Sequence, residues 1–378
     1  MINRMGSLLE QSDARYPVSD DLDEQLQFCA DHGWTDGLPV VPPTTKRVEA
    51  MLSYFDGPVD TCLANIPPRN SVATPVILAA NATMAGCLPE YFPIVVLAVQ
   101  AMCDSAFNLY AVQTTTHSSA PLVIVNGPIA RQLGIDCAHM AFGPGARANA
   151  SIGRAIRLAL MNIGGAIPGV SDLSTYGSPA KFSFCIAENE ANNPWEPLHV
   201  ERGYPPESST VSVFACEAPH NVSDHASFSA RGILTTVAGT SATTGANSVY
   251  HPLAEPLILL SPEHAATIHK DGFSKDDIRQ FLFEHARIAL DRFSAENIDQ
   301  RIRLKHAELF DRDGAKMMVP VATAPERFMI AVVGGAGKHS SFLPSFGNTS
   351  SVTRVLRNSS GEIVKSIEDL RHKGSTEI

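Results

Sequence analysis

Four carboxylates and one histidine fall in a short polar segment that follows the apolar stretch ending at Ala187. Glu188, Glu190 and His199 are the members with the most useful chemistry. Carboxylates that lie close together raise one another's proton affinity, so one of them can act as a general acid or base near neutral pH. This segment therefore predicts acid–base catalysis, with Glu188 or His199 as the general base.

Two other interpretations of this segment stay open. Glutamate and histidine are also metal ligands, so a divalent metal ion could be held by His117, Glu188, Glu190 and His199. The structural alternative is a solvated loop in which the acids pair with Arg202. Apart from this alternative of a divalent metal, the cofactor is unknown from the sequence.

His117 and Cys87 are the other two residues that we expect to be catalytic. His117 stands among threonines and serines just before an apolar run, although a buried structural histidine is the alternative. Cys87 precedes a helix that we expect to begin at Pro89 or Pro93. A helix N-terminus stabilises a thiolate, which predicts a nucleophile or, alternatively, a redox-active thiol.

Two glycine-rich loops are candidate anion sites. Residues 143–149 lead into a predicted helix, and residues 334–339 follow a predicted strand. Free backbone amides at such positions bind a carboxylate or a phosphate, whereas both nucleotide-binding glycine motifs are incomplete here. The residues that we expect to contact an anionic small-molecule substrate are Arg147, Asn149, Trp195, Lys338 and His339.

Composition limits the classes of partner. The 378-residue chain has a formal net charge of −10 and shows no basic stripe, which argues against nucleic acid. Its longest apolar run, residues 91–99, is too short to span a bilayer, and we expect a cytoplasmic protein without a membrane partner. Only 18% of the residues are charged, which favours surface buried between subunits and thus a homo-oligomer.

These side chains must be positioned by helices and strands, and both are indicated along the chain. Apolar runs rich in β-branched residues and bounded by turn residues predict buried strands, whereas apolar residues at helical spacing predict helices. The expected strands are 120–125, 182–187, 210–216, 257–260 and 328–333. The expected helices include 21–32, 72–104, 151–163 and 275–293.

The predicted fold class is α/β, with two α/β lobes of similar style. We expect an N-terminal arm and wrapping segment at 1–48, a first lobe at 49–206 and a second lobe at 207–378. A degenerate internal duplication is a further hypothesis, because a strand followed by Asn126-Gly-Pro resembles the strand followed by Gly334-Gly-Ala-Gly.

Several motifs resemble those of a bacterial family related to the UGSC-type (seleno)proteins, over roughly residues 25–350. They are residues 36–44, 84–93, 143–149, 193–202 and 334–339. The resemblance implies an enzyme with a defined site, and the matched positions include Cys87, His117, Glu188, His199 and Lys338. The tetrapeptide that names those proteins is missing, so the resemblance carries no redox role to this chain.

The leading hypothesis is a lyase or hydrolase that breaks or forms a polar carbon–heteroatom bond of an anionic small molecule. Under it, Glu188→Gln and His199→Ala are expected to fold normally and to lose turnover. The alternatives are the divalent-metal enzyme, a thiol redox enzyme that uses Cys87, and a non-catalytic binding scaffold.

Overall fold

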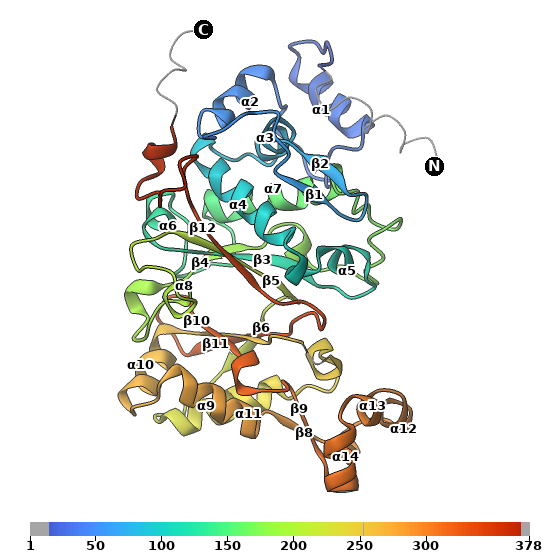
Figure 1. The fold of residues 1–378 in the computed structure, drawn as a ribbon, viewed down its shortest axis with the longest axis vertical. Coiled ribbons are helices and arrows are strands. Elements are labelled where there is room, and N and C mark those ends of the chain that lie inside the picture. The colour runs from blue at the N-terminus through green and yellow to red at the C-terminus, as the bar shows by residue number, and fades with distance from the viewer. Residues whose placement is uncertain (1–14, 252, 372–378) are drawn as a thin grey trace.

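The fold is known from a computed structural model, which describes residues 15–251 and 253–371. Figure 1 shows four stacked layers, in which a layer of helices covers a sheet, a second sheet packs on the first, and more helices cover the second. The α/β class predicted from the sequence is confirmed.

The first sheet consists of four strands, which in spatial order are β12 (Val352–Val355), β5 (Thr210–Cys216), β3 (Ala120–Asn126) and β4 (Cys185–Ala187). β3 and β4 run parallel, and the other two pairings are antiparallel. Its outer face is covered by α3 (Pro75–Met84), α4 (Phe92–Met102) and α7 (Arg147–Asn162). α1 (Leu22–Asp31) and α2 (Thr45–Leu52) lie beyond these helices.

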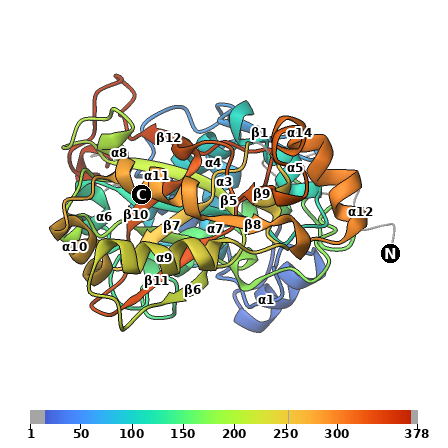
Figure 2. The same cartoon turned by 90° about the horizontal axis from the view of Figure 1, so that it is seen from below.

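The second sheet also consists of four strands, in the order β10 (Met329–Val332), β7 (Leu257–Leu260), β11 (His339–Leu343) and β6 (His220–Ser223). β10 and β7 run parallel, and the other two pairings are antiparallel. Its outer face is covered by α9 (Ala230–Ser241), α10 (Pro262–Lys270) and α11 (Lys275–His285), as Figure 2 shows from below.

Both faces of the central strands are buried, which explains their continuous apolar sequences. On β3, Leu122 and Ile124 face the second sheet, while Val123 and Val125 face the helices. β7 repeats this alternation, with Leu259 in the layer between the sheets. Side chains on successive strand residues point to opposite faces, so a strand inside four layers needs apolar residues at every position.

The two sheets exchange their edge strands. β6 follows β5 in the chain but lies in the second sheet, whereas β12 follows β11 and lies in the first. The sheets therefore do not divide at residues 206 and 207, and the proposed domain bounds stay a prediction. Both sheets share one pattern of strand directions, in which β7 corresponds to β3 and β10 to β4. The similarity between the motifs after residues 125 and 333 would instead make β3 correspond to β10. The internal duplication therefore also stays a prediction.

Other predicted elements differ in their bounds. The helix predicted from residue 72 begins only at Pro75, because Ser71–Ala73 forms β2, which pairs with β1 (Ala64–Ile66) in a hairpin. The predicted helix 275–293 is wrong beyond His285, because β8 (Arg287–Ala289) pairs there with β9 (Met318–Pro320).

Between β8 and β9 the chain forms a helical extension that projects from the second lobe in Figure 1. It contains α12 (Ala295–Asn297), a π-helical turn at Ile298–Ile302, α13 (Arg303–Lys305) and α14 (Ala307–Asp313). Other short helices are α5 (Leu109–Thr114), α6 (Pro128–Gln132) and α8 (Leu198–Glu201). Over the described residues no single helix meets the length and apolarity needed to cross a membrane, although the bent pair Pro89–Met102 and Ser105–Thr114 does so jointly.

Gly127, at the end of β3, is expected to tolerate no side chain. Its φ is +88°, and a Cβ atom there would lie 2.7 Å from the Cα of Ser209 and closer still to the Ser208 carbonyl. Gly134 is a matched control with a φ of +63° and open space around it. Gly134→Ala should lower the free energy of unfolding by about 1 kcal/mol, and Gly127→Ala by about 3 kcal/mol or more. Equal losses in urea denaturation would contradict this packing.

Candidate functional site

Residues 188–202 lie between β4 and β5, which both belong to the first sheet, and they connect this sheet to the second one through hydrogen bonds. Directly after β4, the Asn189 amide donates to the Val332 carbonyl of β10 at 2.8 Å. Farther along, the Trp195 indole donates to the Phe273 carbonyl at 2.8 Å, beside the helices of the second lobe. Trp195 is therefore a packing anchor in this structure, and its predicted contact with a substrate stays a prediction.

Glu188 is the polar centre of this connection. Its carboxylate accepts hydrogen bonds from the Asn126 and Asn193 side chains at 2.6 and 2.9 Å, and from the Leu198 and Val332 amides at 2.8 and 3.4 Å. Only 4% of Glu188 is exposed. Because the donors come from both sheets and from the connecting segment, this one carboxylate ties three parts of the chain together.

Glu190 and His199 lie beside Glu188, as the sequence predicted for a shared site. A Glu190 oxygen accepts from the Asn126 side chain at 2.9 Å and from the Gly127 amide at 2.7 Å. The same oxygen is 3.8 Å from Nδ1 of His199, which is buried. Burial raises the pKa of Glu188, while the charge of Lys275 and the hydrogen bonds act in the opposite direction.

The four proposed metal ligands are not brought together, so this interpretation of the sequence is corrected. His117 precedes the first residue of β3, whereas Glu188 bonds to Asn126, the last residue of that strand. The strand length puts about 20 Å between these two ends. Within residues 15–251 and 253–371, no group of three or more His, Cys, Asp or Glu side chains is arranged to hold a metal ion.

Cys87 is buried in the apolar core between the helices and the first sheet, in the same cluster as Cys185 of β4. Burial raises the pKa of its thiol to about 12, although a hydrogen bond with Ser151 and the charge of Arg147 favour the thiolate. At neutral pH the group is therefore a thiol, which argues against the predicted nucleophile and redox centre. Arg147, predicted to hold an anion, donates to the Gly86 carbonyl at 3.0 Å.

The other predicted anion ligands have different surroundings. Asn149 is buried and fixes its own loop, because its side chain bonds to the backbone of Asp136 and to the Ala141 carbonyl. Lys338 and His339 lie on the second glycine loop, well away from Arg147 in sequence and not bonded to it. The hydrogen bonds of Arg147, Asn149, Lys338 and His339 therefore do not join the two glycine loops into one anion-binding site.

His117 belongs to a second polar cluster, at the end of the sandwich where β3 begins and β5 ends. Its Nε2 atom is 2.8 Å from a carboxylate oxygen of Glu217. Its ring stacks on Phe346, with the centroids 5.6 Å apart. Nδ1 is buried and has no hydrogen-bond partner among the described residues. A histidine held by a carboxylate is a common arrangement for proton transfer.

Three more side chains extend this cluster toward the helical extension. Gly347, next to Phe346, leaves the room that the His251 ring occupies. Arg301 donates to Nε2 of His251 at 3.5 Å, and the ammonium of Lys305 donates to the Val249 carbonyl at 3.2 Å. Burial, with the charge of Arg301, lowers the pKa of Lys305 to about 7. Burial and the charges of Lys305 and Arg301 also lower the pKa of His251.

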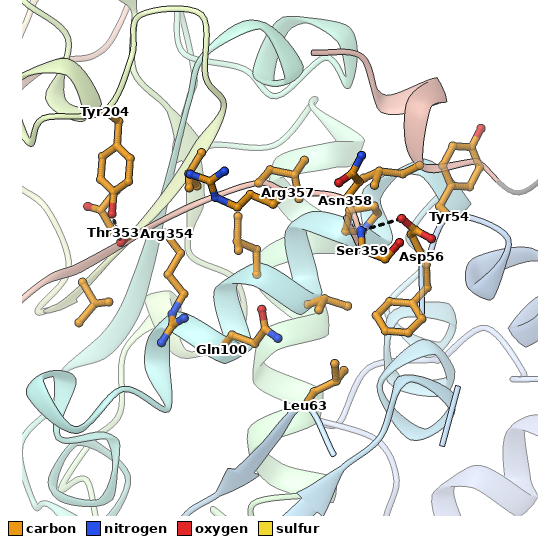
Figure 3. Close-up of a pocket in the computed structure, with 18 of the residues that line it drawn as sticks. Tyr54, Asp56, Leu63, Gln100, Tyr204, Thr353, Arg354, Arg357, Asn358 and Ser359 are labelled. Carbon is orange, nitrogen blue, oxygen red and sulfur yellow. Dashed lines mark hydrogen bonds between the residues drawn. The ribbon is translucent and has the colours of Figure 1, made fainter. Parts of the chain in front are cut away.

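A cavity of about 640 Å³ lies between α4 and β12 (Figure 3). Its lining mixes apolar side chains of α4 with the guanidinium groups of Arg354 and Arg357. Arg354 is 3.2 Å from a carboxylate oxygen of Asp104, and Arg357 donates to the Gly361 carbonyl. None of the predicted site residues lines this cavity, and no histidine or lysine does.

No motif or spacing in the sequence marks Glu217, His251, Arg301 or Lys305 as site residues. The position of His117 just before the predicted strand 120–125 is the one feature of the sequence that indicated a site at this end of the sandwich. In comparisons with protein-family models and with curated proteins, no match to this chain was found. The resemblance to UGSC-type proteins therefore stays a prediction, and the function must be argued from the geometry of the site.

Glu188→Gln is expected to destabilise the protein, contrary to the expectation from sequence that it folds normally. The amide replaces one accepting oxygen by a donor, so that at least one buried partner loses its hydrogen bond. A loss of about 2–3 kcal/mol in the free energy of unfolding should follow, measured by urea denaturation. Glu196→Gln, an exposed position of the same segment, is the control. Equal midpoints for the two variants would contradict the structural role of Glu188.

Lys305 should make the stability depend on pH. Its pKa of about 7 lies below that of an unfolded lysine, so between about pH 7 and pH 10 the unfolded chain binds more protons. The free energy of unfolding attributable to Lys305 therefore rises with pH across this window. Because the amine is partly solvated, about 1–2 kcal/mol is expected, well under the full linkage value. Lys305→Met should remove the rise; an unchanged pH profile would contradict it.

Proposed function

We propose that this protein is an acid–base enzyme for a small anionic substrate, with its reaction centre at His117, Glu217, His251, Arg301 and Lys305. A lyase or hydrolase acting at a polar carbon–heteroatom bond is the reaction class that we favour. The observation that carries the proposal is the gathering of these five side chains from four separate segments of the chain. Groups with shifted pKa values concentrate at functional sites.

Each group has a role that its chemistry suits. Arg301 is a permanent cation and would hold the anionic group of the substrate. Lys305 has a pKa of about 7, so roughly half of its amine is neutral at physiological pH and able to accept a proton. The carboxylate of Glu217 orients His117 and would stabilise its imidazolium form during proton transfer.

The glutamate cluster supports this proposal indirectly. Glu188 accepts four hydrogen bonds, so its lone pairs are engaged within the protein, and a substrate would have to displace one of these donors. The predicted roles of Glu188 and His199 as general bases are thus less favoured than the His117 cluster.

A cytoplasmic homo-oligomer remains part of the proposal. The oligomer rests on the low share of charged residues, 18%, which favours surface buried between subunits.

The proposal is tested by screening the full chain against small carboxylates and phosphate esters, with turnover followed by proton NMR. Lys305→Met should lower kcat about 100-fold or more, since proton transfer by a positioned base contributes on this scale. Arg301→Met should mainly raise KM. The matched controls are Lys316→Met and Arg303→Met, both exposed on the same part of the chain, which should leave turnover unchanged.

Two results would overturn the proposal. One is turnover by the wild-type protein that Lys305→Met and Arg301→Met leave intact. The other is binding of panel compounds without any turnover, which would favour the binding-scaffold alternative.

A further inference from the structure

Two histidines face each other at the edge of the second sheet, away from the His117 cluster. His339 is the first residue of β11, and His225 follows the end of β6, the strand that pairs with β11. Their Nε2 atoms are 3.0 Å apart, and the ring planes are inclined by 74°. Both rings are exposed, so a solute can reach the space between them.

The neighbour of His339 fixes where its ring carries a proton. Nδ1 of His339 is 2.9 Å from the side-chain oxygen of Asn221 on β6. An amide oxygen only accepts, so Nδ1 holds the proton and Nε2 offers its lone pair toward His225. A second ring nitrogen held by a carbonyl or carboxylate oxygen is the usual support of a metal-binding histidine.

The separation of the two nitrogens is close to that of a bound pair. Zinc–nitrogen bonds of about 2.0–2.1 Å at a tetrahedral angle put two ligating nitrogens about 3.3 Å apart. The rings need to open by only a few tenths of an ångström from the observed 3.0 Å. On binding, the ring proton of His225 would move from Nε2 to Nδ1, so that the neutral ring keeps one proton and Nε2 offers its lone pair to the metal ion.

We propose that His225 and His339 bind a divalent transition metal ion, with Asn221 as a positioning residue. Two protein ligands leave the remaining coordination positions to water or to an anionic small molecule. Lys338 lies next to the pair, where its ammonium donates to the His225 carbonyl at 3.4 Å. That positive charge favours an anionic exogenous ligand over a further bound cation.

The proposal is independent of the proposed acid–base function. His339 is the first residue of β11, whereas Phe346 follows the last residue of that strand, and the two sites share no residue. Loss of metal binding and loss of turnover can therefore be scored separately.

The test is a Zn²⁺ titration of metal-free full-length protein without an affinity tag, followed by isothermal calorimetry. One saturable site per chain is expected. His225→Ala and His339→Ala should each weaken its affinity at least tenfold, and Asn221→Ala several-fold. His285→Ala removes an exposed histidine elsewhere and should change nothing, which controls for binding by the other histidines of the chain.

A second measurement identifies the ligands directly. Electron paramagnetic resonance of the Cu²⁺ complex should show two nitrogen couplings in the wild-type protein and fewer in either histidine variant, while the melting temperatures of the metal-free proteins stay the same. The proposal is overturned if no saturable site exists, or if both histidine variants bind Zn²⁺ as tightly as the wild-type protein does.

Discussion

The inner faces of the two sheets are packed against each other, and this apolar contact determines where polar groups can lie. Leu122, Ile124, Leu259 and their neighbours exclude water from the space between the sheets. Polar backbone at the rim of such a contact must find partners within the protein. Glu188 meets this need at one end, where its carboxylate satisfies donors from β3, from β10 and from the connecting segment. Because the Glu188 carboxylate accepts four hydrogen bonds within the protein, we propose that proton transfer involves groups at other parts of the rim.

The strands could be predicted because each buried strand has a recognisable pattern in its own short stretch of sequence. Apolar residues at every position of 120–125 and 257–260, bounded by turn residues, allow few interpretations other than a buried strand. Strand pairing depends on residues that are distant in the sequence, which explains why some predicted element bounds are wrong. The helix predicted to extend to Phe293 ends early because residues 287–289 pair with β9. The sequence near residues 287–289 does not indicate that this pairing exists. The exchange of β6 and β12 between sheets depends likewise on contacts between distant segments.

The candidate site was predictable only in part, for the same reason. Glu188, Glu190 and His199 are neighbours in the structure because they follow one strand within a short segment, and their role as a reaction site stays a prediction. Whether a carboxylate is free or saturated depends on donors such as Val332, which are distant in sequence. Lys305 could not have been found, because its lowered pKa results from burial against the sandwich and from Arg301, and a lone lysine in a polar helix carries no such signal.

Residues 188–202 should hold the two sheets together rigidly, at the end of the sandwich opposite the His117 cluster. Native-state hydrogen exchange of the Leu198 and Asn189 amides tests it most directly, because the Leu198 amide donates to Glu188 within this segment and the Asn189 amide donates to Val332 of the second sheet. If the claim is correct, these amides exchange only by global unfolding, with an opening free energy equal to that of the protein. Exchange at rates typical of a mobile loop, far faster than the amides of β3, would contradict it.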